Sequence, residues 1–273
     1  MGRAGGPGLR RPRLAAHPAG GNRRARHHRP DHRRARHHRP DHGDRRVRPD
    51  RGSALLLAFG VAAAVDLGSL AFGFSEGHGV AKPLLMPLLA AYAYTRGAPR
   101  PLLAALLFGW GGDVLLLSDA EPAFLAGMAS FAAGHICYLV LFGRSGERGR
   151  LTYGIGYALA LAAAVASLWP GLPPDLRLPV AAYSALLTAM AWSATRLGLA
   201  VGLGGALFMV SDLLIATGVA EWPQPPRPDL WIMLTYLAAQ YLLVRGVLGA
   251  RETPGPRRPA PTPAHDEAST NTA

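Results

Sequence analysis

Two aspartate residues lie deep within long apolar segments of this sequence. Asp113 occurs in the stretch GWGGDVLLLS, and Asp212 occurs in GGALFMVSDLLIATG. An ionised side chain near the centre of a bilayer costs a few kcal/mol, so such a residue usually has a functional role. Two carboxylates in one site can act as general acid and general base when one of them holds a proton. The two residues therefore predict acid/base chemistry inside a membrane.

Both aspartates are expected at the same depth. Each lies about thirteen residues after the start of its apolar segment, or roughly 18 to 20 Å along a helix that rises about 1.5 Å per residue. Glycines near each aspartate would let neighbouring helices approach closely. They are Gly109, Gly112, Gly204 and Gly205. We expect the two carboxylates to share one pocket; the alternative is that each is bound by a neighbouring Tyr, Ser or Lys and only joins helices.

Few other polar side chains interrupt the apolar segments. Lys82 is the only lysine in the chain, and it could pair with an aspartate, bind a phosphate or extend to the membrane interface. His135 and Tyr138 are three residues apart and share a helical face with Phe131, so they should point together into the bundle. The remaining polar residues are Asp66, which we expect at an outer end or lining a pore, and Tyr183, Ser211, Tyr236, Gln240 and Tyr241.

These residues must be positioned by membrane-spanning helices. Eight apolar segments, each near the ~20 residues that span a bilayer, follow one another with short polar breaks. Their ranges are 54–73, 80–96, 101–118, 122–143, 151–169, 178–196, 198–219 and 229–248. The sequence thus predicts an all-α integral membrane bundle of about eight transmembrane helices over residues 53–249.

The charges between these segments alternate along the chain. One set of connections and ends carries Arg96, Arg100, Arg144, Arg148, Arg150, Arg196, Arg245, Arg251, Arg257 and Arg258. The other set carries Glu76, Asp119, Glu121, Asp175, Arg177, Glu221, Arg227 and Asp229. Because Lys and Arg collect on the cytoplasmic side, this pattern predicts a multi-pass protein of the cell membrane with both termini cytoplasmic.

The terminal segments differ from the apolar body. Residues 1–52 contain sixteen Arg and four Asp, which accounts for the whole net charge of +12. The basic charge therefore belongs to one segment, and we expect no nucleic-acid partner. Residues 23–32 and 33–42 repeat the sequence RRARHHRPDH without enough apolar residues to form a core, so this tail and residues 250–273 should be disordered.

Three interpretations of the basic tail remain open. It could bind anionic lipid head groups, or its histidines could bind metal. It could also be untranslated, with the true start near Val47. In the body, Cys137 is the only cysteine and His135 the only histidine within the expected spans, so we predict no disulfide, metal site or cofactor.

Several of these stretches together resemble a known family. They are AKPL at 81–84, GD at 112–113 before LLL, FLAGMASFAAGHICY at 124–138, GGALFMVSDLLIA at 204–216 and YLAAQYLL at 236–243. In this order, over about residues 54–248, they resemble the YhhN-like family of membrane proteins, which includes the animal lysoplasmalogenases.

The resemblance implies a hydrolase that cleaves the vinyl ether bond of lysoplasmalogens into a fatty aldehyde and a glycerophospho-alcohol. Asp113 and Asp212 would be the catalytic pair, as in the two-carboxylate chemistry of glycoside hydrolases. Lys82 would bind the phosphate or keep one carboxylate ionised. His135, Tyr138, Tyr183, Ser211 and Gln240 would complete a substrate-binding pocket. The expected partners are a lipid substrate from the bilayer and a second copy of the chain.

Two other functions fit the same residues. Paired carboxylates with a lysine also suit a proton-coupled or small-molecule transporter, and GD in the third expected helix is echoed by SD in the seventh. The absence of clearly broken helices near the midplane disfavours this alternative. A purely structural membrane protein would lose only stability if its aspartates were neutralised.

Overall fold

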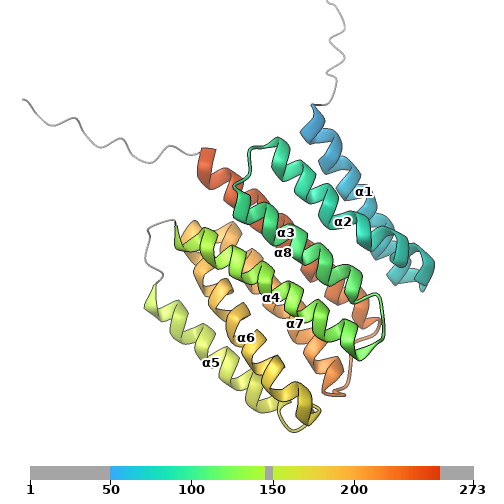
Figure 1. Cartoon of the computed structure of the whole chain (residues 1–273), viewed down its shortest axis with the longest axis vertical. Coiled ribbons are helices and arrows are strands. Elements are labelled where there is room, and N and C mark those ends of the chain that lie inside the picture. Colours follow the sequence, from blue (N-terminus) through green and yellow to red (C-terminus); the bar gives the residue numbers. More distant parts are fainter. Residues whose placement is uncertain (1–49, 145–149, 253–273) are drawn as a thin grey trace, which may run out of the picture. The chain divides into compact units, whose positions relative to one another are not determined.

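The computed structural model describes residues 50–144 and 150–252, and these fold into helices (Figure 1). The helices are α1 (Arg51–Phe72), α2 (Ser75–Thr95), α3 (Arg100–Leu115), α4 (Glu121–Gly143), α5 (Leu151–Leu168), α6 (Pro174–Ala194), the short 3-10 helix η1 (Thr195–Leu197), α7 (Leu199–Val219) and α8 (Pro228–Glu252). The described residues contain no strand, so the predicted all-α class is confirmed. The basic repeat lies outside the described residues.

Each predicted segment corresponds to one helix, and the largest difference at a start concerns α2. We expected this helix to begin at residue 80, but it begins at Ser75. Gly73 ends α1 in the left-handed conformation (φ 80°), which suits a residue without a Cβ. The polar stretch SEGHG then forms the first turn of α2, where Glu76 is favoured by the helix dipole. His78 is therefore helical and belongs to the bundle.

Five helices are long and apolar enough to cross a membrane: α1, α4, α5, α7 and α8. Of the other three, α3 has only 16 residues, and α2 and α6 contain internal prolines, Pro83 and Pro87 in α2 and Pro179 in α6. Many large hydrophobic side chains of the helices are exposed, including Leu57, Leu159 and Leu199. An apolar exterior of this kind suits contact with lipid. The chain is thus a multi-pass membrane protein.

The helices pack mainly as consecutive antiparallel pairs. The pairs α1–α2, α3–α4 and α7–α8 make the most extensive contacts. In Figure 1, α3, α4, α7 and α8 lie between the α1–α2 pair and the α5–α6 pair. Helix α5 is peripheral, since it contacts only α6 and α7 appreciably and buries a single residue, Leu168.

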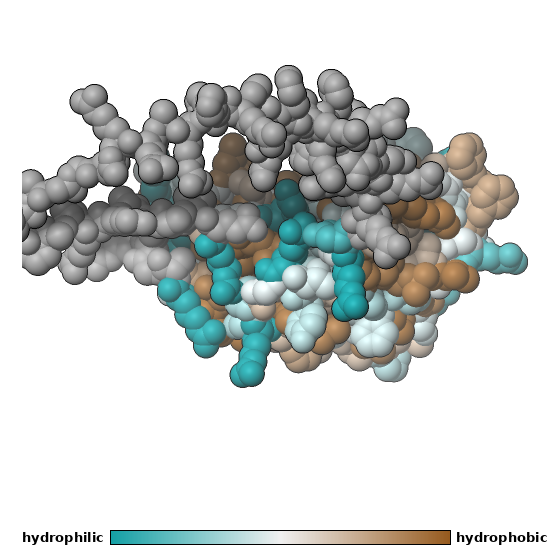
Figure 2. Space-filling model, turned by 90° about the horizontal axis from the view of Figure 1, so that it is seen from above, coloured by the Kyte–Doolittle hydropathy of each residue, from teal (hydrophilic) through white to brown (hydrophobic). Residues whose placement is uncertain are grey.

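The start of α1 and the end of α8 lie at the same end of the bundle (Figure 1). Figure 2 is seen from above and shows several hydrophilic side chains, with hydrophobic residues beside them, on the part of the molecule that is not grey. The opposite end contains the α1–α2, α3–α4, α5–α6 and α7–α8 connections. We call these the terminal end and the opposite end.

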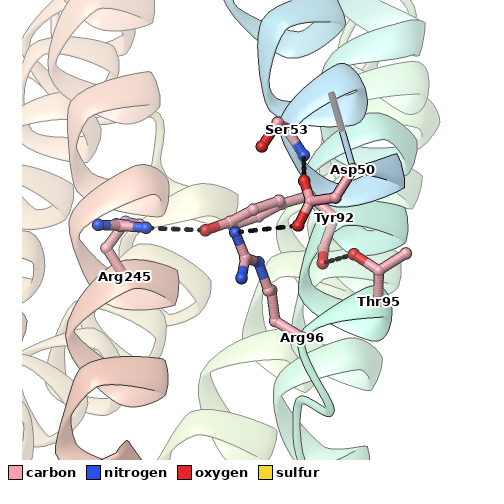
Figure 3. Close-up of polar contacts among 6 residues, drawn as sticks. All are labelled: Asp50, Ser53, Tyr92, Thr95, Arg96 and Arg245. Carbon is pink, nitrogen blue, oxygen red and sulfur yellow. Dashed lines mark hydrogen bonds and ion pairs between the residues drawn. The ribbon is translucent and has the colours of Figure 1, made fainter. Parts of the chain in front are cut away.

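Polar contacts join three helices at the terminal end (Figure 3). Asp50 caps α1 by accepting a hydrogen bond of 2.7 Å from the backbone N–H of Ser53, and its other oxygen lies 3.8 Å from Arg96 Nη2. Arg245 of α8 donates a hydrogen bond of 2.9 Å to the hydroxyl oxygen of Tyr92. Helices α1 and α8 are thus both attached to the last turn of α2.

Candidate active site

Asp212 ends a chain of hydrogen bonds that crosses three helices. Tyr183 of α6 donates its hydroxyl hydrogen to Asp212 Oδ2 on α7. The Nε2 atom of His135, on α4, lies 3.0 Å from the same hydroxyl oxygen. Because that hydroxyl hydrogen is already used, His135 Nε2 must carry a hydrogen and donate it. Among the described residues, the buried Nδ1 atom of His135 has no hydrogen-bond partner.

Asp113 belongs to a second and more deeply buried network. Tyr236 of α8 donates a hydrogen bond of 2.8 Å to Asp113 Oδ2 on α3. Gln240 Nε2 donates to the Tyr236 hydroxyl oxygen at 3.3 Å, and Tyr138 of α4 donates to Gln240 Oε1 at 2.7 Å. Asp113 is only 3% exposed. The hydrogen bond from Tyr236 offsets part of the free-energy cost of burying this carboxyl group.

Aromatic rings lie between the two networks. Phe208 packs edge-on against His135 of the first network, with ring centroids 4.8 Å apart, and against Tyr236 of the second, at 5.4 Å. Phe131 packs edge-on against Phe208 and Tyr236. The two aspartates form no hydrogen bond with each other; each accepts one from a tyrosine. They are nevertheless close enough for the charge of Asp212 to act on Asp113.

Gly112 allows this ring arrangement. A Cβ atom at Gly112 would lie only 2.5 Å from two ring carbons of Phe131, which is closer than van der Waals contact permits. The glycine next to Asp113 therefore admits an aromatic side chain as well as a helix. The two carboxylates, which we expected in one shared pocket, accept hydrogen bonds from two different tyrosines.

A cavity of about 600 Å³ opens between α4, α5, α6 and α7. Its walls are largely apolar, and Asp212 and Tyr183 lie in them, whereas Asp113 does not. The other polar side chains of its lining are Thr152, Tyr153, Tyr157, Arg177, Ser184 and Thr188. This volume and composition are typical of a small-molecule site, in which a few polar groups orient an apolar ligand. The half-buried Asp212 is thus the aspartate that a ligand in this cavity would meet.

Lys82 does not belong to this cavity. It is absent from the cavity lining, but its charge acts on the Asp113 carboxyl group. Within residues 50–144 and 150–252, Lys82 forms no hydrogen bond or ion pair. Of the uses expected for it, the geometry fits an electrostatic partner of Asp113 better than a phosphate ligand in this cavity.

Sequence reasoning missed the pairing of Asp66 with His78. Asp66 is completely buried, and its Oδ1 atom lies 2.8 Å from His78 Nδ1. We expected Asp66 at an outer end or lining a pore, and His78 outside the helices. Because α2 starts at Ser75, His78 lies within the helix, one turn before Lys82 and on the same helical face. The charge of Asp66 also acts on Asp113.

The predicted site residues thus fall into groups. Asp212, Tyr183 and His135 form one network, and Asp113, Tyr138 and Gln240 form the other together with Tyr236. Ser211 joins neither network, because its hydroxyl group donates to the backbone oxygen of Ile232 at 3.0 Å and so links α7 to α8. Arg177, which lines the cavity, was not among the predicted residues.

The fold and these two carboxyl groups define a multi-pass helical membrane protein with a polar site beside a cavity that has largely apolar walls. Comparison with known proteins makes this more specific. The chain belongs to the YhhN family, whose family model matches residues 77–247. The family predicted from the sequence is therefore confirmed.

Curated relatives carry names that state an activity. The chain is 37% identical over 161 residues to human lysoplasmalogenase TMEM86B, covering 59% of this chain and 68% of that protein. It is 36% identical to the pig protein of the same name, covering 58% and 70%, and 30% identical to bovine lysoplasmalogenase TMEM86A, covering 59% and 70%. No solved structure matches the chain.

Proposed function

We propose that this protein is a membrane-embedded hydrolase that cleaves the vinyl ether bond of lysoplasmalogens. Relatives at 30 to 37% identity are named lysoplasmalogenases, and the match covers most of their length. The observation that carries the proposal is the position of Asp212, a carboxyl group in the wall of an apolar cavity with Tyr183 donating to it. An alkenyl chain would occupy the apolar part while its ether meets the acid.

The reaction needs one proton and one water molecule. An acid adds a proton to the β-carbon of the vinyl ether, which leaves an oxocarbenium ion at the α-carbon. Water attacks that carbon and loses a proton, giving a hemiacetal, which separates into a fatty aldehyde and the glycerophospho-alcohol. General acid and base catalysis by positioned carboxyl groups suits both proton transfers.

We assign the proton transfers to Asp212. Protonated Asp212 would give its proton to the β-carbon, and the resulting carboxylate would accept a proton from the attacking water. The hydrogen bond from Tyr183 stabilises the carboxylate between these two steps. His135 positions the Tyr183 hydroxyl group by donating to its oxygen.

Asp113 would act as the second carboxylate of the pair. It lies behind Phe131 and outside the cavity lining, so it would act through its negative charge, which favours the oxocarbenium ion. Such charge effects are strong in a site that excludes water. The positive charge of Lys82 acts on the Asp113 carboxyl group and would favour its ionised form.

The test is release of aldehyde by the purified protein in liposomes. The substrates are an alkenyl lysolipid and the corresponding ester-linked lysolipid, and the wild type should release aldehyde only from the first. The Asp212→Asn variant should lose hydrolysis by about a thousandfold or more, as expected for loss of a general acid. Asp119→Asn, which changes an exposed aspartate in the α3–α4 connection, is the control. A near-wild-type rate in Asp212→Asn would contradict the assignment of the proton transfers, and a near-wild-type rate in Asp113→Asn would contradict the role of its charge.

The transporter alternative is not favoured, because the relatives are named for an enzymatic activity. We further propose that both termini are cytoplasmic, since arginines gather at the terminal end and acidic residues at the opposite end. Labelling of single cysteines introduced at Arg100 and at Asp119 in intact cells would test this orientation. Formation of a homodimer stays a prediction.

A further inference from the structure

We infer that Arg177 binds the phosphate of the lysolipid and so fixes its vinyl ether beside Asp212. The inference rests on the proposed hydrolase function and adds a substrate-orienting residue to it. Arg177 lies in the first turns of α6, at the opposite end of the bundle, and it lines the same cavity as Asp212.

Charge within the cavity supports this role. Among the described residues that line the cavity, Arg177 and Asp212 are the only charged ones. One is a cation and the other an acid, and nearly all the remaining wall is apolar. A lysolipid has the same order of groups: an anionic phosphate, an ether close to it and a long apolar chain. The cavity therefore matches the substrate in charge as well as in polarity.

Two contacts hold the guanidinium group in place. Its Nε atom donates a hydrogen bond of 3.2 Å to the backbone oxygen of Leu172, and its plane lies over the ring of Trp169 at 5.8 Å. In the part of the chain that the structure describes, the two terminal amino groups form no hydrogen bond. A guanidinium group fixed in this way can donate two parallel hydrogen bonds to a phosphate.

The spacing along α6 between Arg177 and the tyrosine that donates to Asp212 fits the substrate. Tyr183, which donates to Asp212, lies six residues after Arg177 on α6, or about 9 Å along a helix at 1.5 Å per residue. In the lysolipid, about seven bonds separate the phosphorus atom from the β-carbon of the vinyl ether. An extended chain covers roughly 1.2 Å per bond, so these bonds span about 8 Å. A phosphate at Arg177 would place the reacting carbon near Asp212.

This assignment replaces the expectation that Lys82 binds the phosphate in this site. Lys82 is outside the cavity lining and acts on Asp113. The sequence placed Arg177, together with Asp175, in the connection before the expected helix at 178–196. Only the folded chain shows that Arg177 lines the cavity.

The test compares two substrates: an alkenyl glycerol 3-phosphate, and the alkenyl glycerol that differs from it only by lacking the phosphate group. In the Arg177→Met variant, kcat/KM for the phosphate-bearing substrate should fall by about ten- to a hundredfold, as expected for loss of charged hydrogen bonds. The value for the alkenyl glycerol should stay within about twofold. Arg227→Met, which changes an exposed arginine at the same end of the bundle, is the matched control and should affect neither substrate.

Other outcomes separate the possible failures. If the wild type releases aldehyde from neither substrate, the proposed function itself fails. If the wild type is active and Arg177→Met lowers both substrates equally, or lowers neither, the inference is overturned while the function stands. Should Arg177→Met not fold, Arg177→Lys keeps a cation and must show a loss confined to the phosphate-bearing substrate. An equal loss on both substrates would again overturn the inference.

Discussion

Tyr183 and Asp212 are joined by a hydrogen bond between α6 and α7, at the wall of the apolar cavity. Tyr183 donates its hydroxyl hydrogen to Asp212, so His135 donates to the same tyrosine oxygen. Asp212 therefore receives a hydrogen bond whether or not it holds a proton on its other oxygen. The carboxyl group of Asp212 can therefore gain or lose a proton without any movement of Tyr183.

If Asp212 is the acid, as proposed, replacing Tyr183 by Phe should lower kcat by about ten- to a hundredfold and leave KM nearly unchanged, because a hydrogen bond to its carboxylate is removed. Steady-state aldehyde release in liposomes measures both constants. Tyr157→Phe is the control, since Tyr157 lines the same cavity and forms no hydrogen bond within the described part of the chain. Equal effects of the two variants would show that the loss comes from cavity shape alone.

The second network predicts a different pattern for Asp113 and Tyr236. Asp113→Asn removes the charge but keeps a group that can accept from Tyr236, so it should lower kcat strongly while the protein stays folded. Tyr236→Phe leaves a buried carboxyl group without its donor, which costs about 1 to 3 kcal/mol of stability. Thermal unfolding and aldehyde release should therefore rank the two variants in opposite orders. The same order in both measurements would contradict a role for the charge.

Gly112→Ala should disturb the site through Phe131. Its Cβ atom would lie 2.5 Å from the Phe131 ring, so the ring must shift, at a cost of about 1 to 3 kcal/mol for such overpacking. Activity should fall even though no polar group changes. Gly60→Ala is the control, because a Cβ there meets nothing within 4 Å. Wild-type stability and activity in Gly112→Ala would show that Phe131 is free to move aside.

Asp50 predicts a pH dependence at the terminal end. Hydrogen bonding to Ser53, aided by the charge of Arg96, lowers the pKa of Asp50 below its ordinary value of 3.8. A carboxyl group whose pKa is lowered by folding stabilises the fold above its ordinary pKa, and this stabilisation is lost as the pH falls through the folded value. Asp50→Ala should therefore lower the unfolding temperature at pH 7, and the difference from the wild type should shrink below pH 3.8.

The control for Asp50 is Asp119→Ala, since Asp119 is exposed and lies outside the helices. Its difference from the wild type should be small and the same at both pH values. A difference for Asp50→Ala that does not depend on pH would mean that the backbone at the start of α1, and not the carboxylate, sets the effect.

The helices and their order follow from the sequence, because the length of an apolar segment and the scarcity of polar side chains within it are local properties. The depth of Asp113 and Asp212 along their helices could also be predicted from helical rise. Which way each helix is rotated could not, since rotation depends on contacts such as Phe131 against Gly112. For this reason the sequence indicated two buried carboxylates but not the rings between them.

The residues that sequence reasoning missed share one property. His78 and Arg177 both lie near the first turn of a helix, in stretches that looked like polar connections. A helix that begins outside the apolar core carries polar residues into the bundle, where their neighbours come from other helices. Composition alone gives no sign of those neighbours.

Helix α5 has a consequence for the substrates that the protein accepts. Its side facing the cavity presents Gly156, Ala160 and Ala164, each one turn after the last, while the helix as a whole buries only Leu168. Side chains added at these positions would occupy the path of the alkenyl chain without touching either aspartate. Related proteins could thus come to prefer shorter or longer lipids through single changes in one outer helix, while their catalytic machinery stayed the same.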